Sequence, residues 1–381
     1  MFLFDTLSVF SISAYLLIAL ITVLCAPKKD LDIFGRRSLL LILAGTILAY
    51  SAGSIWMFLL GWAMTVFPFR SNRCGTLLMA STVALAVGAG LLAFSSDRTA
   101  HIAAFAAIAL AAILRKGIFP FHFWVPIAFE DSSLPALNLF LNSHLGAYLL
   151  IRFSLPLFPD VSSQALTFLG ILAIFTAVYT SVLALVAKRP RRVLALLCVS
   201  QGSFILAGLE NRNVEGITGA LIHWSVVAFA TTVLLAVYRS LEARSSEVES
   251  AEGFLGLGFY APRLAVFFTV AALALVGLPG TLGFVSEDLL FHGSLESHPL
   301  LGIGLPLATA LNAITALKLI ATLFLGRRGI HVPPIPDARP SERWALTLPI
   351  VLLVAGGLAP SVFLALRTPS AERIAGFLAG R

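Results

Sequence analysis

Residues 115–126 read Arg-Lys-Gly-Ile-Phe-Pro-Phe-His-Phe-Trp-Val-Pro. The apolar segments around this stretch are long enough to span a membrane, yet the stretch itself carries a lysine, a histidine and two prolines. Charged groups and interrupted helices at membrane depth are costly, so they are kept mainly where they line a route for ions or substrates. The stretch therefore predicts a membrane protein with a broken helix, and it indicates transport.

The composition of the chain places it in lipid. Hydrophobic residues make up 59% of its 381 residues and charged residues 12%, and its mean hydropathy is +0.95. A soluble domain carries roughly a quarter charged residues, so this chain has too much apolar surface for water. The net charge of +7 comes from short basic runs between apolar segments and not from one patch, which argues against nucleic-acid binding.

No sequence pattern predicts a cofactor, a metal site or a catalytic centre. The three cysteines, Cys25, Cys74 and Cys198, stand far apart, and the sequence has no CxxC pair. It also has no nucleophile–base arrangement and no phosphate-binding loop. We therefore expect no cofactor, no metal and no catalytic residue, and a stand-alone enzyme is the least favoured class.

About twelve membrane-spanning helices are predicted, because a span needs about 20 apolar residues. The first segment has no basic start and is long enough to span, so we expect a helix and not a signal peptide. Segment 37–69 allows one long tilted helix or two short ones. The predicted helices are 3–25, 37–51, 53–69, 75–95, 100–127, 134–152, 165–187, 193–208, 217–238, 264–291, 300–325 and 345–366.

The basic residues decide between these alternatives and orient the chain. Lys28, Lys29, Arg36 and Arg37 precede segment 37–69, and Arg70 and Arg73 follow it. A hairpin places both basic loops on the inner side, as the positive-inside rule favours, whereas one helix does not. With the hairpin, both termini lie on the outer side. We expect an integral protein of a bacterial inner membrane.

Two predicted helices are interrupted. Helix 100–127 breaks near Pro120 and Pro126, and helix 264–291 breaks at residues 277–280, which read Gly-Leu-Pro-Gly. Breaks at matching places in two halves indicate inverted repeats with the transport path at the breaks. The expected fold is thus an all-α polytopic membrane protein with two inverted five-helix repeats, each with a broken helix. The expected parts are an N-terminal helix with a basic loop (1–36), the repeats (37–152 and 165–325) and a C-terminal loop with a helix (326–381).

Ionisable residues inside these apolar segments are the candidate site, since a charge at the bilayer centre costs roughly 2.5–3.5 kcal/mol on insertion scales. Each has a duller explanation: a lysine can snorkel, a histidine can bond a backbone carbonyl, and a carboxylate can end a helix in water. Glu130 and Asp131 follow the first broken helix and are predicted helix-end carboxylates. The predicted ion-relay residues are Lys116, His122, His144, His223, Glu287 and Lys318.

The stretch from Lys116 to Pro126 resembles the K-x-x-x-P-x-H-x-W-x-P motif of the antiporter-like proton-translocating membrane subunits. That family includes complex I L/M/N-type subunits and Mrp antiporter, membrane-bound hydrogenase and DabB-type inorganic-carbon-pump subunits. Residues 191–201 and 275–286 resemble its R-x-L-A and second broken-helix segments. The resemblance implies two inverted five-helix repeats with a mid-membrane chain of charged residues.

Departures from the family pattern matter as much as the match. Lys116 and His223 alone keep both the position and the residue type of the family's ionisable residues. The substituted positions are Ala63 (family glutamate), His144 (lysine), Arg191 (lysine), Val227 (histidine), Thr231 (lysine) and Glu287 (lysine). Ala63 removes the carboxylate that the family pairs with its lysine, so an active relay needs another arrangement around Lys116.

Three functions stay open on the sequence alone. The first is an antiporter-like membrane subunit of a multisubunit complex, which carries or couples proton or Na⁺ translocation through the ionisable residues. The second is the proton-coupled energising subunit of an inorganic-carbon (CO₂ or bicarbonate) uptake complex. The third is a degenerate, non-conducting scaffold subunit. The expected partners are other membrane subunits, a soluble protein and the lipid bilayer, with no nucleic acid.

Overall fold

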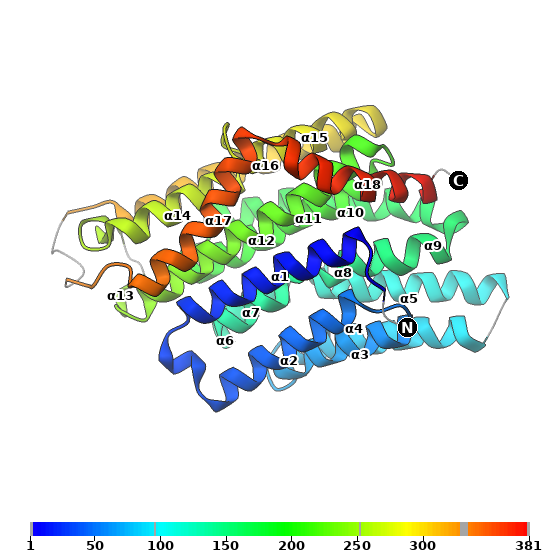
Figure 1. The fold of residues 1–381 in the computed structure, drawn as a ribbon, viewed down its shortest axis with the longest axis horizontal. Helices are drawn as coiled ribbons and strands as arrows, with labels where there is room; N and C mark the ends of the chain where they lie inside the picture. The colour runs from blue at the N-terminus through cyan, green and yellow to red at the C-terminus, as the bar shows by residue number, and fades with distance from the viewer. Residues whose placement is uncertain (1–2, 95–96, 251–252, 328–333, 379–381) are drawn as a thin grey trace.

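The computed structural model describes residues 3–94, 97–250, 253–327 and 334–378. Every regular element in these ranges is a helix, and the long helices lie side by side along the long axis of the molecule (Figure 1). Ten of them are long and apolar enough to cross a membrane, and two shorter apolar helices accompany them. The structure therefore confirms an all-α polytopic membrane protein.

The N-terminal half alternates long helices with short breaks. Helices α2 and α3 pack against each other, so segment 37–69 forms two helices, as the basic loops predict. The elements are α1 (Thr6–Cys25), η1 (Lys28–Leu31), α2 (Ile33–Tyr50), α3 (Ile55–Val66), η2 (Phe67–Phe69), α4 (Gly75–Phe94), α5 (Arg98–Lys116), η3 (Phe121–Phe123), α6 (Trp124–Asp131), α7 (Leu134–Asn142), α8 (Leu145–Leu149), η4 (Leu150–Ser154) and α9 (Leu155–Leu157).

The C-terminal half ends differently from the prediction. The prediction of a single last helix at 345–366 is wrong, because the helix that begins at Pro340 stops at Leu358 and a further helix follows Pro360. Proline has no N–H group, so Pro360 cannot continue the helical hydrogen bonds. The elements are α10 (Pro159–Val186), α11 (Pro190–Glu210), α12 (Val214–Glu242), α13 (Glu247–Ser250), η5 (Leu257–Phe259), α14 (Pro262–Leu275), α15 (Leu282–Ser297), α16 (Pro299–Phe324), α17 (Pro340–Leu358) and α18 (Ser361–Leu378).

Both predicted helix interruptions are present. Helix α5 ends at Gly117, whose φ of 67° is easy for glycine, and the chain continues through η3 into α6. Helix α14 ends before Gly277, which has a φ of 72°, and α15 follows it. The two broken helices start from opposite ends of the molecule (Figure 1). The division into two inverted five-helix repeats stays a prediction.

A third interruption was not predicted. The expected helix 134–152 is divided at Ser143 and His144, and its second part contains the π-helical turn η4. The Tyr50 hydroxyl donates a hydrogen bond to the Ser143 carbonyl, and His144 has a φ of 42°. A left-handed conformation is strained for a residue with a side chain, and such strain concentrates at functional positions.

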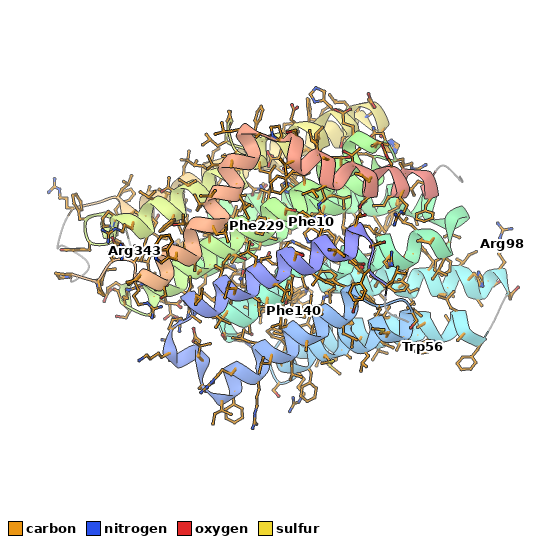
Figure 2. All side chains as sticks on the ribbon, viewed as in Figure 1. Phe10, Trp56, Arg98, Phe140, Phe229 and Arg343 are labelled. Carbon is orange, nitrogen blue, oxygen red and sulfur yellow. The ribbon has the colours of Figure 1, made fainter. Side chains whose placement is uncertain are left out.

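The centre of the molecule is formed by α11 and α12, which are buried along nearly their whole length. Helix α12 packs against α11, α14, α15, α17 and α18. Phe140 and Phe229 lie in this interior, whereas Trp56 lies on the outer surface, 49% exposed (Figure 2). A helix that is apolar all round belongs in a core, while the exposed apolar side chains of the outer helices suit contact with lipid.

The two ends of the described chain lie together at one end of the molecule (Figure 1). Thr6 and Ser370 form a hydrogen bond between their hydroxyls at 3.3 Å, and Asp5 pairs with Arg152 at 2.7 Å and with Arg373 at 3.1 Å. The basic turn η1 and α13 lie at the opposite end (Figure 1). The termini thus share one side; that this side is the outer one stays a prediction.

Candidate functional site

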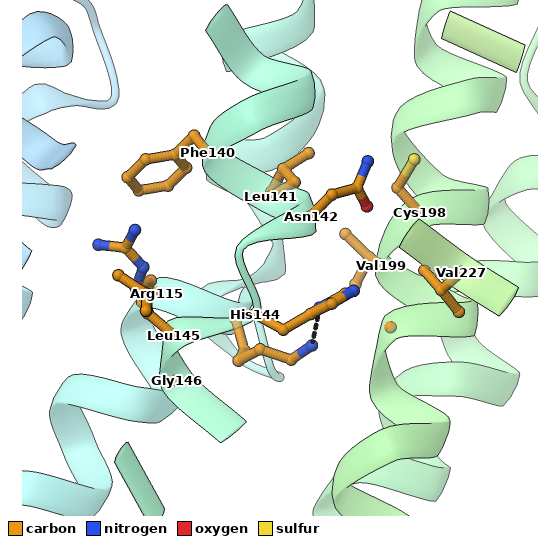
Figure 3. Close-up of a pocket in the computed structure, with 12 residues that line it drawn as sticks. Arg115, Phe140, Leu141, Asn142, His144, Leu145, Gly146, Cys198, Val199 and Val227 are labelled. Atoms are coloured by element: carbon orange, nitrogen blue, oxygen red, sulfur yellow. Dashed lines mark hydrogen bonds between the residues drawn. The ribbon is translucent and has the colours of Figure 1, made fainter. Parts of the chain in front are cut away.

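Lys116 and His144 form the closest pair of the predicted relay. Lys116 is the last residue of α5 before the break, and its Nζ lies 3.1 Å from Nδ1 of His144 (Figure 3). His144 is 4% exposed, and its Nε2 has no hydrogen-bond partner among the described residues. In the described part of the chain, Lys116 makes no ion pair with a carboxylate. The nearest polar neighbour of the lysine is therefore an imidazole and not a carboxylate.

A small cavity adjoins this pair. The space open to the centre of a water molecule is about 20 Å³, and roughly 10–15 Å³ on that measure holds one water. Lys116, His144, Asn142 and Gly202 are among its lining residues (Figure 3). A Cβ atom at Gly202 would lie 3.4 Å from Nζ of Lys116, so the missing side chain leaves α11 close to the ammonium group.

His223 continues the polar contacts from α11 to the second broken helix. Its Nε2 lies 3.2 Å from the carbonyl oxygen of Gln201, the residue before Gly202, and its Nδ1 lies 3.1 Å from Oγ of Ser286 on α15. His223 and Gln201 are fully buried, and the side-chain amide of Gln201 interacts with the carboxyl group of Glu287. Gln201 therefore joins α11 to Glu287 as well as to His223.

Glu287 follows Ser286 on α15 and is the last of the predicted relay residues in this part of the molecule. The Thr309 hydroxyl on α16 donates a 3.1 Å hydrogen bond to its Oε2, and the carboxyl group also interacts with the side chain of Gln201. A Cβ atom at Gly277 would come within 2.5 Å of Oε2, so glycine at the break lets the carboxylate approach the backbone. A cavity of about 320 Å³ adjoins Glu287 and Thr309 and gives the carboxylate a space toward the surface.

The family lysine position at Thr231 lies in an uncharged polar cluster. The Thr231 hydroxyl donates to Oδ1 of Asn142 at 2.9 Å, and Nδ2 of Asn142 donates to Oδ1 of Asn138 at 2.8 Å. Asn138 in turn donates to Thr22 on α1 at 2.8 Å. The cluster joins α12, α7 and α1 without any ionisable group.

Arg115, next to Lys116, is a buried cation that the sequence reading left aside. Its Cζ lies 4.4 Å from the Trp62 ring and 4.1 Å from the Phe140 ring, and the residue is 3% exposed. Neither Nη atom has a hydrogen-bond partner among the described residues. The two ring faces stabilise the charge, since a desolvated cation over a ring gains roughly 2 kcal/mol.

The remaining predicted residues lie apart from these contacts. His122 in η3 stacks on Phe119 at 5.9 Å between ring centres and meets Tyr179 at 5.1 Å. Nζ of Lys318 donates to the backbone carbonyls of Leu185 and Ala187, so it caps the C-terminal end of α10. A relay role for these two residues stays a prediction.

Glu130 and Asp131 form a pair of carboxylates at the end of α6. Arg73 makes two hydrogen bonds with Asp131, at 2.5 and 2.6 Å, and lies 3.8 Å from Glu130. The hydrogen bonds from Arg73 and its positive charge lower the pKa of Asp131. Both residues stand in the last turn of α6, and their role as helix-end carboxylates stays a prediction.

Sequence reasoning missed Gln201, Asn142 and Arg115 as site residues. Neutral amides carry no signal of function in an apolar helix, because their importance depends on which side chains face them. For Arg115, one signal was available in the sequence. Apart from Lys116 it has no basic neighbour, so it does not belong to a basic loop, and the preceding helices supply aromatic residues that can pack on it.

The family model described as NADH:quinone oxidoreductase/Mrp antiporter, transmembrane, matches residues 7–312. The chain belongs to this family. Family membership and the ten apolar helices establish an antiporter-like integral membrane subunit of the complex I and Mrp kind.

Curated proteins similar to this chain include NADH-quinone oxidoreductase subunits. The chain is 29% identical over 269 residues to NADH-quinone oxidoreductase subunit N 2 of Aquifex aeolicus, covering 68% of this chain and 54% of that protein. It is 28% identical over 273 residues to subunit M of Rickettsia conorii, covering 70% and 55%. The chain thus spans about half the length of these curated relatives.

Solved structures share the fold. Respiratory complex I from Thermus thermophilus contains a chain with a TM-score of 0.88 at 24% identity, covering 99% of this chain and 86% of that one. The Mrp complex from Dietzia sp. DQ12-45-1b contains one with a TM-score of 0.82 at 19% identity, covering 99% and 86%. At these identities the likeness concerns the fold alone.

Proposed function

We propose that this chain carries a proton-translocating step of a larger membrane complex, along a route from Lys116 to Glu287. The observation that carries the proposal is two sets of polar contacts that adjoin at Gly202. Lys116 pairs with His144 at one broken helix, Gln201 and His223 contact Glu287 and Ser286 of the other, and the small cavity at Gly202 lies between the two sets. Ionisable residues beside helix breaks are where transport paths lie in membrane proteins.

The chemistry along the route suits proton transfer. Lysine, histidine and glutamate each bind and release a proton, and serine, threonine and water pass one on through hydrogen bonds. The cavity beside Lys116 is large enough for one water, which would bridge groups that do not touch directly. His144 beside Lys116 can accept a proton from it, at a lysine that makes no ion pair with a carboxylate in the described part of the chain.

The partners follow from the relatives. The matched relatives and structures are subunits of complex I and of Mrp complexes, so we propose that this chain works beside other membrane subunits, with a soluble partner, in a bacterial inner membrane with both termini outside. The energising subunit of an inorganic-carbon uptake complex stays a prediction, which no observed contact favours. Proteins that co-purify with the full chain would separate the two: redox subunits for one and a carbonic-anhydrase-like protein for the other.

The direct test is proton flux. The complex purified through the full chain is placed in proteoliposomes with an internal pH dye, and Lys116→Ala is compared with the unchanged chain. We expect flux to fall at least tenfold while assembly is normal. Lys29→Ala, an exposed lysine of η1, is the matched control and should leave flux unchanged. Replacing Na⁺ by choline in the same assay identifies the ion.

A non-conducting scaffold is the second candidate, and the substitutions at Ala63, Val227 and Thr231 favour it. The side-chain hydrogen bonds of Thr231 and Asn142 join neutral groups, which supports a role without charge at this position. Under this alternative, Lys116→Ala combined with His223→Ala leaves both assembly and flux of the complex unchanged. A strong flux defect with normal assembly would reject the scaffold.

A further inference from the structure

A cavity unrelated to the route lies at the end of the molecule where α13 is found (Figure 1). It has a volume of about 880 Å³, within the roughly 300–1,000 Å³ of small-molecule sites. It opens between the C-terminal end of α10, the start of α11 and the last turns of α16. Its lining includes Lys188, Arg189, Ser250, Phe254, Lys318 and Thr322.

Among the residues that the structure describes, the charged side chains of the lining are all positive. Lys188 and Arg189 are exposed and make no ion pair within this part of the chain. Lys318 is held at the wall, because its Nζ donates to the carbonyls of Leu185 at 2.8 Å and Ala187 at 3.2 Å. An ammonium group has three donors, so one N–H of Lys318 stays available to a ligand.

Exposed apolar side chains accompany these cations. Phe254 is part of the lining and is 57% exposed, while Val186 (67% exposed) and Leu317 (56% exposed) stand close in sequence to Lys188 and Lys318. The cavity therefore offers three positive charges at its rim beside an apolar surface, a combination that suits an amphiphile with an anionic head.

We propose that this cavity binds the head group of an anionic phospholipid, with the phosphate among Lys188, Arg189 and Lys318 and the acyl chains along Val186 and Leu317. Basic pockets between membrane helices on the cytoplasmic side bind anionic head groups, and each nearby cation contributes to the attraction. The excess of basic residues in the loops at this end of the molecule predicts, by the positive-inside rule, that it faces the cytoplasm. An acidic soluble ligand would gain nothing from the apolar border.

Native mass spectrometry of the full chain in a neutral detergent tests the site. Phosphatidylglycerol and phosphatidylcholine are titrated separately, and the apparent Kd of the first bound lipid is measured. We expect phosphatidylglycerol to bind at least tenfold more tightly, and the triple variant Lys188→Gln, Arg189→Gln, Lys318→Gln to lose this preference. The matched control, Lys29→Gln, Arg36→Gln, Arg37→Gln, removes the same charge from an exposed basic turn and should keep it.

Two further experiments distinguish a bound phospholipid from a free anion or a protein partner, and one further variant controls for misfolding. Inorganic phosphate that competes with phosphatidylglycerol at equal concentration would overturn the lipid assignment in favour of a free anion. A photoreactive residue at position 254 is expected to label lipid in native membranes; labelling of a protein subunit alone would also overturn it. Lys318→Gln alone, which keeps a donor toward the α10 carbonyls, guards against a folding defect and should weaken lipid binding by itself.

Discussion

Gly202→Ala tests the proton route without touching an ionisable residue. The added Cβ would lie 3.4 Å from Nζ of Lys116, which is ordinary van der Waals contact, so the backbone has no need to move. The methyl group would nevertheless occupy part of a cavity of only about 20 Å³ beside the lysine. A hydrogen bond to a charged group is worth roughly 1.5–3 kcal/mol, so loss of one bridging water should slow transfer by about tenfold to a hundredfold.

The stability of the variant should move in the opposite direction. Alanine is favoured over glycine inside a helix by about 1 kcal/mol, so Gly202→Ala should unfold no earlier than the unchanged chain in detergent. Gly90→Ala is the control, because a Cβ there meets nothing within 4 Å. Proton flux in proteoliposomes is the readout. Wild-type flux in Gly202→Ala, with assembly intact, would refute the reasoning that transfer passes beside this glycine.

Three further predictions concern other contacts. Gly277→Ala places a Cβ within 2.5 Å of Glu287 Oε2 at a φ of 72°, so it should reduce flux more than Gly90→Ala while a crystallographic or cryo-EM map shows the carboxylate displaced. Because Arg73 lowers the pKa of Asp131, the Arg73–Asp131 pair stabilises the fold at pH values above the ordinary aspartate pKa, and this stabilisation is lost as the pH falls through the lowered pKa. The difference in melting temperature between Asp131→Asn and the unchanged chain should therefore vanish at low pH. A difference that does not depend on pH would contradict this prediction. Arg367, 2% exposed, lies 3.6 Å above the Phe10 ring, so Arg367→Met should change the melting temperature little and Arg367→Ala should lower it; equal effects would show that charge, not volume, matters.

Much of the fold could be predicted from local sequence. Apolar runs of span length, proline and glycine at the breaks, and the basic loops depend only on neighbouring residues, and they gave the helix positions and the hairpin of α2 and α3. The last helix was missed in part because Arg367 and Arg373 make α18 look like a polar tail, whereas Arg367 is buried against Phe10. The sequence does not distinguish a charged residue that is buried in the protein from one that is exposed to water.

By itself, the sequence determined that this chain is a membrane protein, where its helices break and which family it resembles. The length of an apolar segment, the position of a proline and the spacing of a motif are all properties of contiguous residues. Only the tertiary structure decided which ionisable groups meet. The Lys116–His144 contact depends on the turn at Ser143 that Tyr50 holds from another helix, and the link to His223 depends on the backbone of Gln201. Such contacts join residues far apart in the chain, and their distances are set by how the helices pack.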